Sequence, residues 1–223
     1  LFHEPCRERR NAMLILGLTG SIGMGKTTAA DNFRWFGVPV HDADAAVHQL
    51  MNVGGAAVPL ISRAFPGVEV GGRIDRSKLG AMVFNNLVLL QRLEEIIHPM
   101  VATHKYQFIK SASRRRAPIV VLDVPLLFET GGDAACDAVV TVSAPDFVQT
   151  RRVLARPGMD QRRLDQILEK QMPDAEKRRR SDFVVPTGLG RLESLRGIRK
   201  IINNVSAWPA RRWPPWIARR SLR

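Results

Sequence analysis

Short apolar runs alternate with amphipathic stretches along much of the chain. The apolar runs cover residues 14–18, 38–40, 119–123, 138–142 and 183–185. Two of them, 119–123 and 138–142, are compact and β-branched, as in strands buried on both faces of a parallel sheet. The stretches between the apolar runs predict helices over residues 26–36, 43–51, 146–156 and 189–205. This alternation predicts an α/β fold, a doubly wound parallel sheet with helices on both faces.

Two stretches interrupt the alternation with helical patterns alone. From about residue 52 to residue 116, apolar residues recur at helical spacing and no strand is expected. Asp75 or Ser77 can cap the second helix of this stretch, and Pro99, which lacks an N–H donor, should bend or restart the third. A charged helical stretch follows the fourth strand.

These patterns predict the organisation of the chain. We expect a core of residues 13–51, 115–150 and 182–206, a helical region of residues 52–114, and a helical segment of residues 151–181. The flanking residues 1–12 and 207–223 have no periodic pattern and are expected to be disordered.

Charge is concentrated in the last third of the 223 residues. The chain has 34 Lys and Arg against 21 Asp and Glu, a formal net charge of +13. Residues 13–150 carry twelve basic and twelve acidic side chains, whereas residues 151–180 carry ten and five, and residues 191–223 nine and one. A chain-wide basic surface is therefore excluded, although a polyanionic ligand near the last third is favoured.

Other classes are excluded by what the sequence lacks. No apolar run approaches the roughly 18 residues of a membrane-spanning helix, so we expect no membrane partner. Cys6 and Cys136 are far apart and give neither a disulfide framework nor metal-ligand spacing. This cysteine usage is typical of a reducing compartment, and we expect a cytoplasmic protein.

The turn after the first predicted strand carries the strongest chemical motif. Its eight residues fit the pattern G-x-x-x-x-G-K-[ST]: Gly20, Ser21, Ile22, Gly23, Met24, Gly25, Lys26 and Thr27. A strand precedes the motif and a helix follows it, so backbone N–H groups can surround phosphate oxygens, Lys26 can reach the β- and γ-phosphates, and the Thr27 hydroxyl can bind Mg²⁺. The motif predicts ATP or GTP binding on a P-loop NTPase-like fold.

Carboxylates follow two of the predicted strands. Asp123 ends the run 119–123, where a metal-binding carboxylate is typical of nucleotide-binding folds; the alternative is that it only caps the turn before Pro125. Asp42 and Asp44 follow the second strand. One of them can cap the next helix, and we assign that role to Asp42. Asp44 is then the candidate base that accepts a proton from an attacking hydroxyl.

Arginines in the charged stretch can stabilise a transferred phosphoryl group. Helical spacing places Arg152 and Arg156 on one face, and a mobile segment could bring both to the reacting phosphate. The remaining arginines, Arg162, Arg163 and Arg178–Arg180, are more typical of a solvated face. His98, next to Pro99, is more typical of a core or capping residue than of a ligand.

In combination these segments resemble the dephospho-CoA kinases over about residues 13–202. The matching segments are Leu16–Thr28, His41–Asp44, Gly72–Gly80, His98–Pro99, Asp123–Glu129, Gln171–Pro173 and Ser181–Val185. The resemblance implies transfer of the ATP γ-phosphoryl group, with Mg²⁺, to the ribose 3′-hydroxyl of dephospho-CoA, giving coenzyme A and ADP.

The resemblance also implies roles for residues and regions. Gly20–Thr28 would bind ATP, Asp44 would be the general base, and Arg152 and Arg156 would be lid arginines within residues 151–181. Residues 52–114 would hold the CoA moiety. The implied substrate-binding positions are Arg73, Asp75, His98 and Glu129.

Two alternatives remain open at this stage. The same core could phosphorylate another small alcohol, because fold does not fix substrate. The chain could also be a nucleic-acid-binding NTPase whose tail stacks bases on Trp208, Trp213 and Trp216 among arginines. We favour a solvated tail and expect no nucleic-acid partner.

Overall fold

The structure is a computed structural model that describes residues 12–84 and 86–214. The chain divides into two compact units. The first unit runs to His41 and resumes at Ser111; the second comprises Asp42–Lys110. The boundary thus falls at the start of the helix after the second strand, about ten residues before the expected start of the helical region.

The first unit is built on a five-stranded sheet of order β2-β5-β1-β6-β7. Its strands are β1 (Leu14–Thr19), β2 (Val40–Asp42), β5 (Ile119–Asp123), β6 (Ala138–Ser143) and β7 (Phe183–Pro186). β1 pairs in parallel with β5 and β6, and β6 pairs in parallel with β7. The predicted α/β fold is therefore confirmed. β2 begins two residues later than expected, because the Val38 N–H bonds back to the end of the preceding helix and Pro39 has no N–H.

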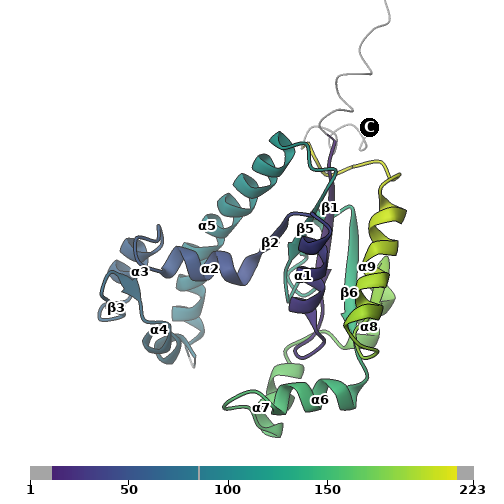
Figure 1. The fold of residues 1–223 in the computed structure, drawn as a ribbon. Coiled ribbons are helices and arrows are strands. Elements are labelled where there is room, and N and C mark those ends of the chain that lie inside the picture. Colours follow the sequence, from purple (N-terminus) through teal and green to yellow (C-terminus); the bar gives the residue numbers. More distant parts are fainter. Residues whose placement is uncertain (1–11, 85, 215–223) are drawn as a thin grey trace, which may run out of the picture. The chain divides into compact units, whose positions relative to one another are not determined.

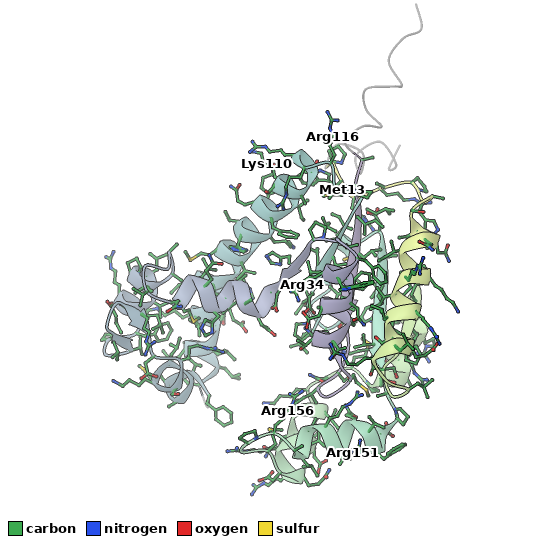
Figure 2. All side chains as sticks on the ribbon, in the orientation of Figure 1. Met13, Arg34, Lys110, Arg116, Arg151 and Arg156 are labelled. Carbon is green, nitrogen blue, oxygen red and sulfur yellow. The ribbon has the colours of Figure 1, made fainter. Side chains whose placement is uncertain are left out.

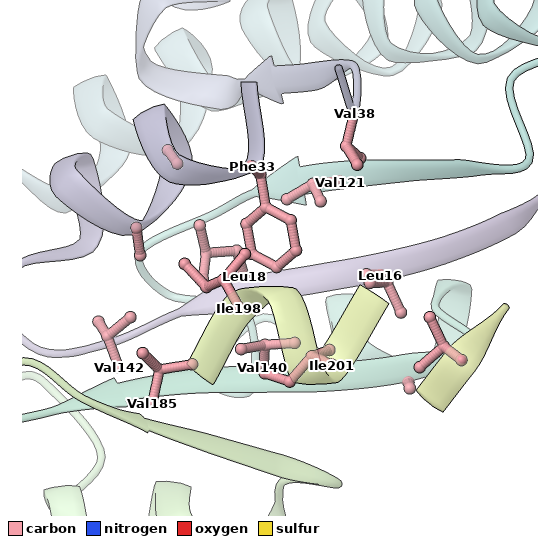
Figure 3. Close-up of a cluster of buried hydrophobic side chains, with 14 of the residues drawn as sticks. Leu16, Leu18, Phe33, Val38, Val121, Val140, Val142, Val185, Ile198 and Ile201 are labelled. Carbon is pink, nitrogen blue, oxygen red and sulfur yellow. The ribbon is translucent and has the colours of Figure 1, made fainter. Parts of the chain in front are cut away.

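The first unit contains helices in addition to its sheet. They are α1 (Lys26–Trp35), α6 (Asp146–Leu154), α7 (Gln161–Leu168), α8 (Asp174–Arg180) and α9 (Arg191–Val205), with a 3₁₀ turn η2 (Gly132–Ala135). α1 and α9 lie side by side on one face, as Figures 1 and 3 show. Alternate strand residues such as Leu16, Leu18 and Val140 pack there against Phe33 and Ile198, and all five are fully buried.

The other face of the sheet is covered by α8 and by the segment after β5. A Cβ atom added at Gly17 of β1 would lie 2.6 Å from Leu127 and 2.9 Å from the Cys136 sulfur, which shows how closely this segment approaches. α8 contributes the fully buried Lys177. Helices on both faces hold the strand ends in fixed positions, which is what a site at the carboxyl edge requires.

The second unit is mainly helical, with α2 (Ala43–Met51), α3 (Val58–Ala64), α4 (Arg76–Val83) and most of α5 (Leu87–Arg114). Asp42 accepts a hydrogen bond from the Ala45 N–H and so caps α2, as expected. Asp75 accepts from the N–H groups of Ser77 and Lys78 and caps α4, which resolves the choice between Asp75 and Ser77. This unit has its own core around Ile61.

Two local expectations in the second unit were wrong. A short antiparallel hairpin, β3 (Glu69–Val70) and β4 (Arg73–Ile74), lies where no strand was expected. Gly71 and Gly72 form its turn with φ of 58° and 75°, angles that glycine adopts readily. α5 also continues through Pro99, so of the two alternatives expected there, a bend or a restart, the restart is wrong; Ile97 and Met100, on either side of the proline, pack into the core of this unit.

Part of the tail expected to be disordered is packed. Trp208 lies against Phe183 with ring centroids 5.6 Å apart, and Trp213 is buried. The backbone N–H groups of Arg211 and Arg212 donate to the carboxylate of Asp137, which also accepts from the Ile15 N–H. The expected disorder of residues 1–11 and 215–223 concerns positions outside the described residues. No helix among the residues the structure describes is long and apolar enough to cross a membrane.

Candidate active site

The loop between β1 and α1 has the backbone geometry that its motif predicts. Gly23 and Gly25 have φ of 76° and 85°, a conformation that residues with a Cβ rarely adopt. A Cβ at Gly23 would also lie 2.6 Å from Val153 and 3.0 Å from the Gln149 carbonyl oxygen. α1 begins at Lys26, and the first N–H groups of a helix have no partner within it, so they can receive an anion.

Lys26 and Asp123 meet at the carboxyl edge of the sheet. The Lys26 ammonium donates to the Asp123 carboxylate over 2.5 Å, and the Asp123 side chain is almost fully buried. Asp123 ends β5 in register with Leu18, one residue before β1 ends. Parallel pairing therefore brings together two residues 97 positions apart, one from each predicted motif.

Thr27 and Asp123 are the donors available for a divalent cation. Thr27 lies in the first turn of α1 with an exposed side chain, and Asp123 supplies carboxylate oxygen. Mg²⁺ bound with a nucleotide takes one or two protein oxygens and fills its remaining positions with phosphate oxygens and water. This donor set fits such an ion, although among the described residues no cluster of three metal-ligating side chains occurs.

A cavity of about 310 Å³ lies beside the phosphate loop. Its lining includes the loop backbone, two hydroxyl groups at the start of α1 and three arginines: Gly25, Thr27, Thr28, Arg152, Arg156 and Arg191. Arg156 lies just beyond the C-terminal end of α6 with its side chain exposed (Figure 2). The lining thus combines hydrogen-bond donors with three positive charges, as a polyphosphate ligand requires.

Arg152 is already engaged by the protein. Its guanidinium donates to the Gly23 carbonyl over 3.4 Å and to Thr187, whose hydroxyl and carbonyl accept at 3.2 and 2.8 Å. The buried Thr187 hydroxyl donates in turn to the Met24 carbonyl at 2.6 Å. Arg152 and Thr187 therefore stabilise the phosphate loop by binding the carbonyl groups of Gly23 and Met24. Arg156, in contrast, lines the cavity with an exposed side chain.

The candidate site residues of the second unit differ in exposure and in whether they line a cavity. Asp44 is exposed in the first turn of α2 and forms no hydrogen bond or ion pair with any residue that the structure describes. Arg73 and Asp75 line a cavity of about 270 Å³, but Asp75 also caps α4. His98 is exposed in the middle of α5 and does not line that cavity.

Glu129 lies in an ion pair within the first unit. Its carboxylate accepts from the fully buried Lys177 ammonium at 2.9 Å and from the Met172 N–H at 2.8 Å. Burial alone would raise the pKa of Glu129, but these two donors together hold the pKa below its ordinary value. Lys177 also donates to the Pro125 carbonyl, so the pair ties α8 to the segment that follows Asp123.

Several supporting residues were missed by sequence reasoning. Thr187, Gln149 and Lys177 belong to no motif pattern, and Gln171 was noted only as part of the resemblance. Thr187 follows β7, so its position at the carboxyl edge of a strand was the one available indication of its role. Gln149, Lys177 and Gln171 contact residues far away in the sequence, and no local pattern indicates such contacts.

Comparison with known proteins gives a consistent result. A sequence model of the dephospho-CoA kinase family (CoaE) matches residues 14–189. The dephospho-CoA kinase of Rhodopseudomonas palustris strain BisB18 is 53% identical over 201 residues, covering 90% of this chain and 100% of the relative. That of Paramagnetospirillum magneticum is 58% identical over 166 residues, 74% of this chain and 78% of the relative.

Two solved structures share the fold of this chain. The crystal structure of TT1252 from Thermus thermophilus is 36% identical, with a TM-score of 0.76 over 86% of this chain and 97% of that one. Dephospho-CoA kinase from Campylobacter jejuni, at 20% identity, has the same fold, with a TM-score of 0.60 over 86% and 97% of the two chains.

Proposed function

This chain belongs to the dephospho-CoA kinase family, and we propose that it transfers the γ-phosphoryl group of ATP to the ribose 3′-hydroxyl of dephospho-CoA. The products are coenzyme A and ADP. The observation that carries the proposal is the phosphate loop with Lys26 and Asp123 joined at its edge. The family identity supplies the acceptor, since a phosphate loop alone is compatible with many acceptors.

The first unit binds and polarises the phosphates. Loop N–H groups and the start of α1 receive the phosphate oxygens, and Lys26 exchanges Asp123 for the β- and γ-phosphates when ATP binds. When bound, Mg²⁺ neutralises charge on those oxygens, with Thr27 and Asp123 as its protein ligands. Arg156 stabilises the charge that spreads over the transferred group, while Arg152 keeps the loop in shape.

The second unit supplies the acceptor site and the base. Asp44 accepts the proton of the 3′-hydroxyl as that oxygen attacks the γ-phosphorus. Its carboxylate is suited to this role because Asp42 already caps α2, so Asp44 has no capping duty. Arg73 lines the cavity of this unit and offers an exposed cation to the anionic groups of dephospho-CoA.

The described part of the tail gives limited support to the nucleic-acid alternative. That alternative needs tail tryptophans that can stack on bases: Trp213 is buried, and Trp208 packs on Phe183 but stays 37% exposed. Trp216 lies outside the described residues. The basic charge near the phosphate loop is accounted for by a nucleotide triphosphate.

Substitution of Asp44 tests the proposed chemistry. Asp44→Asn should lower kcat by about 10²–10⁴ because a positioned general base contributes a factor of this order. ATP binding, measured with a fluorescent analogue, should be unchanged. Asp42→Asn is the matched control: it removes an equal charge two residues away, and asparagine caps helices as well as aspartate does. Equal turnover by the two variants would remove Asp44 from the mechanism.

A further inference from the structure

Ile22, in the phosphate loop, is held by two glutamine side chains. The Gln149 amide nitrogen donates to the Ile22 carbonyl at 2.8 Å, and the Gln171 amide oxygen accepts from the Ile22 N–H at 3.1 Å. Both polar backbone groups of Ile22 are thus bound by the protein. The orientation of each side-chain amide is fixed by its partner, since a carbonyl can only accept and an N–H can only donate.

Gln149 lies two residues before the lid segment, residues 151–181, and Gln171 lies within it, ten residues before its end. Gln149 is in α6, just before the segment begins, and its residue is 5% exposed. Gln171 follows α7, just before α8. The helices α6 and α7 between them pack against each other. A single residue of the loop is therefore clamped between the outgoing and the returning chain of the lid.

Each glutamine is itself fixed in place. α6 lies against the loop at Gly23, where a Cβ would come 3.3 Å from the Gln149 Cγ atom. On the returning side, the Met172 N–H donates to Glu129, and Glu129 is held by the buried Lys177. This chain of contacts sets the backbone next to Gln171, so the ion pair anchors the residue that binds the loop.

We propose that Gln149 and Gln171 are positioning residues that fix the Ile22 peptide groups and thereby couple the lid segment to the shape of the phosphate loop. The inference rests on the proposed kinase function for its substrate, but its central claim concerns ATP binding alone. Glu129 acts in this account by holding the Gln171 end of the clamp, in place of the substrate contact that the resemblance implied. ATP binds well only where both hydrogen bonds persist, because they hold the loop N–H groups in position before the nucleotide arrives.

One substitution at each glutamine separates hydrogen bonding from charge. Gln171→Glu keeps an oxygen that accepts from the Ile22 N–H, whereas Gln149→Glu replaces the donor with an anionic oxygen facing the Ile22 carbonyl. Gln166→Glu, on the exposed surface of α7, is the control for added charge. Gln171→Leu removes the acceptor without adding charge.

The readout is the dissociation constant of a fluorescent ATP analogue, with KM for each substrate, kcat and the melting temperature of the same variants. Gln149→Glu and Gln171→Leu should weaken ATP binding about tenfold, the scale of one lost hydrogen bond with a group left unpaired. Gln171→Glu should stay within about threefold of the Gln166→Glu control. KM for dephospho-CoA should not change.

Two results would overturn the inference. If Gln149→Glu and Gln171→Glu weaken ATP binding equally, the added negative charge causes the loss of affinity, and the hydrogen bonds do not. If Gln149→Glu and Gln171→Leu lower only the melting temperature and bind ATP like the control, the two glutamines are merely structural. Failure of the proposed function would give a different result. The variants would then show the expected order of ATP affinities, but the wild-type protein would not phosphorylate dephospho-CoA.

Discussion

The buried ion pair of Lys177 and Glu129 gives a quantitative prediction. Glu129→Gln keeps the size of the side chain but removes the charge that compensates Lys177. The Lys177 side chain has no solvent exposure, and its remaining partners, the glutamine amide oxygen and the Pro125 carbonyl at 3.3 Å, would both be neutral. An ammonium group would then be left in the interior without a counter-ion.

The cost can be worked from this geometry. Breaking a buried ion pair by removing one partner costs about 3–5 kcal/mol. The Glu129 side chain is 18% exposed, so solvent screens the pair in part and we expect about 2–3 kcal/mol. For a chain of this size that corresponds to a melting temperature lower by about 5–10 °C.

The pH dependence has a defined sign. Because the pKa of Glu129 is lowered in the folded protein, its contribution to stability is complete above the ordinary value of 4.5 and is lost as the pH falls below it. Urea unfolding of wild type and Glu129→Gln should therefore differ most near neutral pH and converge in acid. Glu169→Gln removes an equal charge from an exposed position and should change the free energy of unfolding little.

The double variant Glu129→Gln, Lys177→Met completes the test. It removes the uncompensated ammonium, so it should recover at least half of the lost unfolding free energy. Equal stability of Glu129→Gln and Glu169→Gln at neutral pH would contradict a stabilising role for the ion pair. So would wild-type stability of Glu129→Gln together with a raised KM for dephospho-CoA alone, the result expected of a substrate ligand.

Two further predictions concern the phosphate site. Asp123→Asn should lower Mg²⁺-dependent turnover by at least about 10² while the protein stays folded, measured as rate against Mg²⁺ concentration; an unchanged rate would leave Asp123 with only a structural role. Arg156→Gln should lower kcat by at least about tenfold with little change in melting temperature, whereas Arg152→Gln should lower the melting temperature and weaken ATP binding, because Arg152 supports Gly23 and Thr187. The reverse pattern for the two arginines would contradict their assigned roles.

The fold was largely predictable because the central strands β1, β5 and β6 are buried on both faces. Such strands appear in the sequence as uninterrupted apolar runs, and β5, for example, has the bounds expected of it. Helix starts were predictable where a side chain caps them, as Asp42 does. The hairpin of residues 69–74 was missed because strands of two residues have no measurable period, although Gly71-Gly72 between them was a usable turn pattern.

The limits of prediction at the site follow from sequence distance. The phosphate loop is contiguous, so its eight residues and their chemistry were predictable together. The contacts that support it join residues more than a hundred positions apart, as between Gln149 or Gln171 and Ile22. Likewise, the packing of Trp208 on Phe183 depends on the end of α9 meeting β7, which no local pattern indicates.

The products of a single reaction test the proposed kinase activity. Purified protein is incubated with ATP, Mg²⁺ and dephospho-CoA, and the products are identified by mass spectrometry and ³¹P NMR. We expect ADP and coenzyme A in equal amounts, with the new phosphate on the ribose 3′-oxygen. Formation of ADP at the same rate with and without dephospho-CoA, or a phosphate at another position, would contradict it.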